Sequence, residues 1–129
     1  MILLDTHIWV WWVSQHPRLT PQQQQEIQTH QANGLGVSAI SCWEVAKLVE
    51  LGRLQLNQPV SQWITQALAY PSVQLLDLTV QIAVESTQLP GTFHRDPADQ
   101  MIVATARTYN LALLTADDKI LSYPHVITL

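Results

Sequence analysis

Short apolar runs alternate with longer segments of helical periodicity along the whole chain. The helical pattern is clear where apolar side chains recur every three or four positions, as over residues 60–68. The runs expected to form strands are 1–4, 36–40, 73–78, 111–115 and 126–129. The segments expected to form helices are 8–13, 21–32, 42–51, 60–68, 79–89, 97–110 and 119–123. This alternation predicts an α/β fold in one domain, residues 1–129, with a parallel sheet between two layers of helices.

Capping residues mark the beginnings of two of these helices. Asp96 and Pro97 suit the N-cap and the first helical position, because a proline there loses no hydrogen bond, and Asp99 then takes the third position. Ser41 and Glu44 have the spacing of a capping box, in which the serine caps the helix and the glutamate reaches back to it. Capping alone therefore explains each of these acids singly.

The helix over 8–13 is apolar nearly all round, which indicates a buried helix or one that a partner covers. Trp9 and Trp12 are expected in the core, and Trp11 remains for a partner. Apolar side chains of the helix over 42–51 extend this surface. The members of this apolar docking surface are Trp11, Leu48, Val49 and Leu51.

Length and cysteine content indicate one intracellular domain. The 129 residues suffice for a single core, and the one cysteine, Cys42, cannot form an internal disulfide. The first residues lack the pattern of a signal peptide, and no apolar run approaches the length of a membrane span. We therefore expect a soluble, cytoplasmic protein.

The net charge of −4 argues against a protein that holds nucleic acid by a broad basic face. Two divalent cations would bring this charge to about zero. A metal-dependent enzyme that acts on phosphates therefore remains compatible with the composition.

Carboxylates recur where strands give way to helices. Asp5, Glu44 and Asp117 each follow a predicted strand, and Asp99 lies in the first turn of another helix. In a parallel sheet these junctions share one edge, so we expect the acids to meet there. Two carboxylates about 4 Å apart repel by about 4 kcal/mol at an effective dielectric constant of about 20, a cost that capping does not require. A hard cation such as Mg²⁺ or Mn²⁺ would compensate for it.

Four motifs in this order resemble the PIN-domain ribonucleases, and among them the VapC-type toxins of bacterial toxin–antitoxin pairs. The motifs are Leu4-Asp5-Thr6-His7, Ser38-Ala39-Ile40-Ser41-Cys42-Trp43-Glu44, His94-Arg95-Asp96-Pro97-Ala98-Asp99 with Ala104-Thr105-Ala106, and Leu114-Thr115-Ala116-Asp117. The resemblance implies a PIN-like three-layer α/β/α domain and a Mg²⁺- or Mn²⁺-dependent endoribonuclease. It also implies a partner antitoxin, a homodimer, and an acidic pocket built by Asp5, Glu44, Asp99 and Asp117.

The working hypothesis is hydrolysis of phosphodiester bonds in single-stranded or loop RNA. Metal held by Asp5, Asp99 and Asp117 would activate a water molecule and polarise the phosphate. Glu44 would orient a ligand or a water molecule. The resemblance, rather than the spacing, implies products that end in a 5′-phosphate and a 3′-hydroxyl.

Residues beside these acids are assigned supporting roles. Asp96 is favoured as a cap, or as a group behind the ligands, over a direct ligand. His94 could contact a phosphate, and Thr115 could bond a carboxylate, although capping explains Thr115 more simply. The chain departs from the family at Gln100, where relatives usually carry an arginine, and Arg95 is the hypothesised substitute.

Two other classes of protein share parts of this pattern. A phospho-receiver domain also gathers acids at strand ends, but it needs a lysine at the end of a strand, and Lys119 follows Asp118 into a helix. A catalytically silent binding module with the same fold would use only the apolar docking surface, extended by Leu54 and Leu56. That surface suits an antitoxin equally well, so this alternative stays open.

Overall fold

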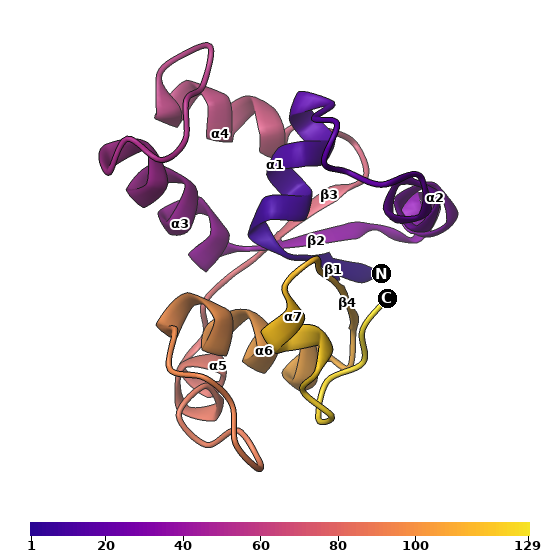
Figure 1. The fold of residues 1–129 in the computed structure, drawn as a ribbon, viewed down its shortest axis with the longest axis vertical. Helices are drawn as coiled ribbons and strands as arrows, with labels where there is room; N and C mark the ends of the chain where they lie inside the picture. Colours follow the sequence, from indigo (N-terminus) through magenta and orange to yellow (C-terminus); the bar gives the residue numbers. More distant parts are fainter.

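The computed structural model describes residues 1–129 and centres on one parallel sheet (Figure 1). Its strands lie in the order β3-β2-β1-β4, and all neighbouring pairs are parallel. The strands are β1 (Ile2–Leu4), β2 (Leu35–Ser38), β3 (Val73–Leu76) and β4 (Ala112–Leu114). Leu3 of the central strand pairs with Gly36 on one side and with Leu113 on the other.

Helices cover both faces of the sheet, which confirms the predicted three-layer α/β/α arrangement (Figure 1). One face carries α1 (Thr6–Ser14), α2 (Pro21–His30), α3 (Ala39–Glu50) and α4 (Val60–Leu68). The other carries α5 (Val80–Glu85), α6 (Pro97–Tyr109) and α7 (Asp118–Leu121). A short 3₁₀ helix, η1 (Gln31–Asn33), links α2 to β2, and none of the helices is long and apolar enough to cross a membrane.

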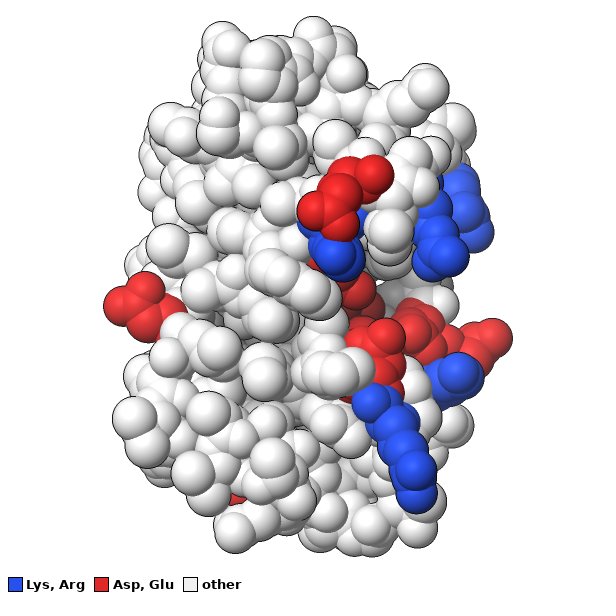
Figure 2. Space-filling model, turned by 90° about the vertical axis from the view of Figure 1, so that its left-hand side faces the viewer, with Lys and Arg blue, Asp and Glu red and all other residues white.

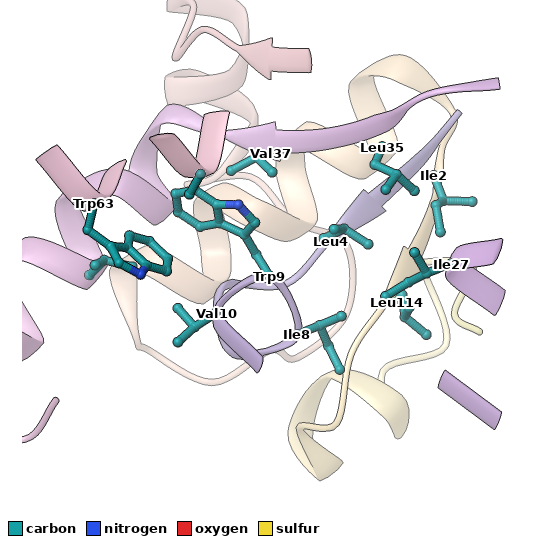
Figure 3. Close-up of a cluster of buried hydrophobic side chains, with 12 residues drawn as sticks. Ile2, Leu4, Ile8, Trp9, Val10, Ile27, Leu35, Val37, Trp63 and Leu114 are labelled. Atoms are coloured by element: carbon teal, nitrogen blue, oxygen red, sulfur yellow. The ribbon is translucent and has the colours of Figure 1, made fainter. Parts of the chain in front are cut away.

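Alternation along the central strand divides the core into two clusters. Ile2 and Leu4 point to the cluster under α1 and α4, and Leu3 points to the cluster under α6 and α7. Trp9 is fully buried in the first cluster, where its ring meets the edge of Trp63 with centroids 5.2 Å apart (Figure 3). The sheet strands are thus fixed from both sides, and their carboxyl ends lie at one edge.

The beginning of α6 is the one that the sequence predicts. Asp96 is its N-cap, and its Oδ1 accepts a hydrogen bond from the backbone N–H of Asp99 at 2.9 Å. Pro97 occupies the first helical position. Because the proline and the cap fix the first turn, the carboxylate of Asp99 has a defined direction.

The capping box predicted at the beginning of α3 is wrong. The helix begins at Ala39 and its N-cap is Ser38, whose Oγ accepts a hydrogen bond from the N–H of Ile40 at 3.2 Å. The chain turns directly from β2 into α3, so Ser41 lies within the first turn and is fully buried. Glu44 lies one turn further along and is free for another role.

Three other expectations differ from the structure. The strand predicted over 126–129 is reduced to a single parallel bridge between Leu113 and Thr128. Helix α5 ends at Glu85 rather than at 89, and Ser86 is its C-cap. Strand β3 ends at Leu76, so Asp77 follows the strand instead of lying inside it, and its side chain is exposed.

Candidate functional site

The four predicted acids lie at the carboxyl edge of the sheet. Asp5 caps α1 directly after β1, and Asp117 caps α7 after β4. Asp99 lies in the first turn of α6, and Glu44 lies in α3 after β2. Figure 2 shows acidic side chains gathered on one part of the surface with basic side chains at its margins. The parallel topology therefore brings carboxylates from four separate segments into one region.

Asp5 is the most rigidly held of these carboxylates. Its Oδ1 accepts a hydrogen bond from the N–H of Thr6 at 2.8 Å, and its Oδ2 accepts one from the hydroxyl of Thr115 at 2.7 Å. The hydroxyl of Thr115 in turn accepts the N–H of Asp117 at 3.0 Å. Asp5 is 6% exposed, so this network fixes a buried carboxylate and ties it to the turn that presents Asp117.

Glu44 is bound to the same helix start through Thr6. The hydroxyl of Thr6 donates to Oε1 of Glu44 at 2.5 Å and is also hydrogen bonded to Oγ of Ser41 at 2.8 Å. Both Thr6 and Ser41 are almost fully buried. This link between α1 and α3 replaces the capping role predicted for Glu44. The sequence shows only that Ser41 is polar and follows a strand, so the contact could not be foreseen from local patterns.

Asp99 is placed where its charged form is strongly disfavoured. Burial is the largest cause and the surrounding carboxylates add to it, so the pKa of Asp99 is raised to about 8. The contributing acids are Asp5, Asp96, Asp117 and Glu44. The other four carboxylates therefore lie within electrostatic reach of Asp99.

The other two inner acids respond in the same direction. Burial raises the pKa of Asp5, and hydrogen bonds from Thr115 and Thr6 offset part of that rise. Burial also raises the pKa of Glu44, and the charge of Asp5 adds to it. The nearby His7, whose side chain is exposed, lowers the pKa of both carboxyl groups. A further positive charge at this site would therefore stabilise the ionised forms of these carboxyl groups.

Oxygen donors from carboxylates fit a hard divalent cation better than a soft metal. No group of three histidine, cysteine, aspartate or glutamate side chains converges closely enough to form a finished metal site. Burial and the charges of four other carboxylates nevertheless raise the pKa of Asp99, and a cation near Asp99 would offset both effects. The residues present therefore fit a divalent metal ion.

His94 lies in the loop before α6, and Gln100 lies in the first turns of that helix. Nε2 of His94 is buried and lies 2.9 Å from Oδ2 of Asp99, without the alignment of a hydrogen bond. The side-chain amide of Gln100 donates to the backbone carbonyl of His94 at 3.0 Å. Gln100 thus holds the loop that carries His94, a role that its sequence position did not suggest. Arg95 and Asp96 are exposed at the rim.

The apolar docking surface is only partly open. Leu51 is 52% exposed, whereas Leu48 and Val49 are half-buried. Trp11 is also half-buried, and the guanidinium of Arg18 lies 5.1 Å from the centre of its ring. Trp43, which is not among the residues predicted for this surface, is 54% exposed and directly precedes Glu44.

Known proteins match this chain in sequence and in fold. The PIN domain family matches residues 2–126. Ribonuclease VapC22 of Mycobacterium tuberculosis is 37% identical over 124 residues, which cover 96% of this chain and 92% of that protein.

Solved structures share the architecture at low identity. VapBC2 from Rickettsia felis, bound to a DNA fragment from its promoter, has a TM-score of 0.72 at 18% identity and covers 100% of this chain and 98% of its own. A toxin–antitoxin complex from Klebsiella pneumoniae has a TM-score of 0.68 at 21% identity, with 99% and 97% covered. The family match over almost the whole chain, together with the identity to a curated member, shows that this protein belongs to the PIN-domain family.

Proposed function

We propose that this protein is a metal-dependent endoribonuclease and the toxin of a toxin–antitoxin pair. Its 37% identity to a protein named as a ribonuclease supports RNA as the substrate. The observation that carries the proposal is the buried Asp5 together with Asp99, whose pKa is raised to about 8 by burial and by the charges of four other carboxylates. A purely structural site has no use for such crowding of like charges, because their repulsion destabilises the fold.

Asp5, Asp99 and Asp117 would hold the metal, Mg²⁺ or Mn²⁺, through carboxylate oxygens. When bound, the ion would make a water molecule a stronger nucleophile and stabilise the charge that develops on the phosphate. Thr115 keeps Asp5 in a fixed orientation and links it to the Asp117 turn. The metal-binding geometry is thereby prepared by hydrogen bonds that do not themselves touch the ion.

Glu44 and the loop before α6 would act on the substrate side. The carboxylate of Glu44 is oriented by Thr6 and would accept a hydrogen bond from the attacking water. His94 lies against Asp99, where its N–H would restrain that carboxylate or meet a phosphate oxygen. Arg95 is exposed, carries no ion pair, and would contact an RNA phosphate at the rim in place of the arginine that relatives carry at Gln100.

An antitoxin would bind the apolar docking surface, and a second copy of the chain would complete the active form. The structural relatives are toxin–antitoxin complexes, which supports the first partner. The second partner, another copy of the chain, would pack against α5. Val80 of this helix is 82% exposed and Val84 lies exposed on the same side, and such uncovered apolar residues are typical of interfaces. Action on RNA agrees with the cytoplasmic location that the sequence predicts.

Cleavage of a mixed-sequence single-stranded RNA with Mg²⁺, Mn²⁺ or EDTA tests the enzyme directly. We expect activity with metal, none with EDTA, and a fall of at least about 100-fold in Asp5→Asn and Asp99→Asn. Asp77→Asn is the matched control, because Asp77 is exposed at a neighbouring strand end and is not among the acids that act on Asp99. Absence of cleavage with every metal would favour the catalytically silent binding module. Equal rates of cleavage in all three variants would refute the assignment of the active site to Asp5 and Asp99.

A further inference from the structure

A strip of aromatic and basic side chains runs along α1 away from the acidic site. His7 and Trp11 lie one helical turn apart on one face, with ring centroids 5.9 Å apart. His7 is exposed and lies in the first turn of α1, two residues after Asp5. The strip therefore begins close to Asp5.

The turn after α1 folds back over this strip. Gln15 adopts the left-handed conformation with φ of 53°, and the N–H of His16 then donates to the carbonyl of Trp11 at 2.8 Å. His16 stacks over Trp11 at a centroid distance of 6.2 Å and an interplanar angle of 27°. Arg18 follows, and its guanidinium lies 5.1 Å from the centre of the Trp11 ring.

Arg18 has no acidic partner in the structure. The four ion pairs involve other residues, so the contact with Trp11 is what positions the guanidinium. The side chain of Arg18 is exposed, and no carboxylate neutralises its charge. Its N–H donors are therefore available to a ligand. A fixed, unpaired guanidinium on a strip that leads away from the acidic site suits an anion that extends beyond that site.

We propose that His7, Trp11, His16 and Arg18 form a track for the single strand of RNA next to the bond that is cut. Arg18 binds a backbone phosphate, and the exposed His7 and His16 rings take the faces or edges of unstacked bases. Single-strand binders combine basic groups with aromatic side chains in this way, including arginine held by a ring. This inference rests on the proposed ribonuclease function and deepens it.

The same observations weigh against protein docking at this point. An apolar antitoxin segment would need the Trp11 ring uncovered, whereas Arg18 and His16 lie over it. Leu48, Val49 and Leu51 remain available for the antitoxin on α3. Trp11 therefore contributes to RNA binding and not to the apolar docking surface.

Steady-state cleavage of single-stranded RNA with Mn²⁺ by Arg18→Gln tests the track. We expect KM to rise several-fold while kcat stays within about twofold of the unmodified protein, because binding outside the reacting group is lost. The dependence of log(kcat/KM) on log salt should become shallower by about 0.7, the slope for one phosphate contact to a single strand. Trp11→Phe should behave like the unmodified protein, and Trp11→Leu like Arg18→Gln.

Arg53→Gln is the matched control, because Arg53 is another exposed arginine without an ion pair. It should leave KM and the salt slope unchanged. Equal kinetics in Arg18→Gln and Arg53→Gln would overturn the track and return Trp11 to the apolar docking surface. Failure of the unmodified protein to cleave RNA is a different result, since it would refute the proposed function itself.

Discussion

Replacing Asp99 with asparagine should stabilise the metal-free protein at alkaline pH. The side chain of Asp99 is 13% exposed, and its folded-state pKa of about 8 lies well above the ordinary value of 3.8. Between these two values the unfolded chain has lost the proton that the folded chain retains. The free energy of unfolding therefore falls as the pH rises through this window, and the full loss is reached above pH 8.

The size of the effect follows from the difference between the two pKa values. One pH unit corresponds to about 1.4 kcal/mol, so ionised Asp99 destabilises the folded state by roughly 6 kcal/mol at most. We expect Asp99→Asn to raise the free energy of unfolding by at least about 1 kcal/mol at pH 8.5, or several degrees in Tm for a domain of this size.

Urea unfolding of both proteins in EDTA, at pH 5 and at pH 8.5, measures this difference. The stability gained in Asp99→Asn should be several times larger at pH 8.5 than at pH 5, since Asp99 is protonated in the folded protein at pH 5. Adding Mn²⁺ at pH 8.5 should stabilise the unmodified protein more than the variant. A gain that is independent of pH, or a loss of stability at pH 8.5, would refute the electrostatic argument.

Three further substitutions test the supports of the site. Trp63→Ala should lower the free energy of unfolding by about 3–5 kcal/mol in urea, because it leaves a cavity in the core; a loss below about 1 kcal/mol would contradict its packing role. Asp96→Ala should cost about 0.5–2 kcal/mol of stability through the lost cap, whereas equal stability would place that carboxylate elsewhere. Thr115→Val should reduce RNA cleavage about 10- to 100-fold by freeing Asp5, and an unchanged rate would show that the hydrogen bond is dispensable.

Local signals in the sequence predicted elements that depend on local chemistry. Asp96 and Pro97 begin α6 as expected, because an N-cap and a proline act on their own turn. The strand alternation likewise predicted the parallel sheet and brought Asp5 and Asp117 to one edge. The order of strands and helices was therefore enough to place these acids at one edge of the sheet.

Contacts between distant segments could not be predicted in this way. Ser41 and Glu44 had the spacing of a cap, but α3 begins earlier and both side chains bind Thr6 across the gap between helices. The last strand was expected from an apolar run, yet it pairs through one bridge because only Leu113 offers it partners. Each outcome depends on tertiary packing, which a single segment does not encode.

Titration calorimetry of Mn²⁺ into the protein at pH 7 tests the central claim, that carboxylates from separate helix starts form one metal site. The unmodified protein and Asp77→Asn should bind with the same affinity. Asp5→Asn and Asp99→Asn should each lose most of that binding while remaining folded by circular dichroism. Equal Mn²⁺ affinity in all four proteins, or no binding in any of them, would contradict the claim.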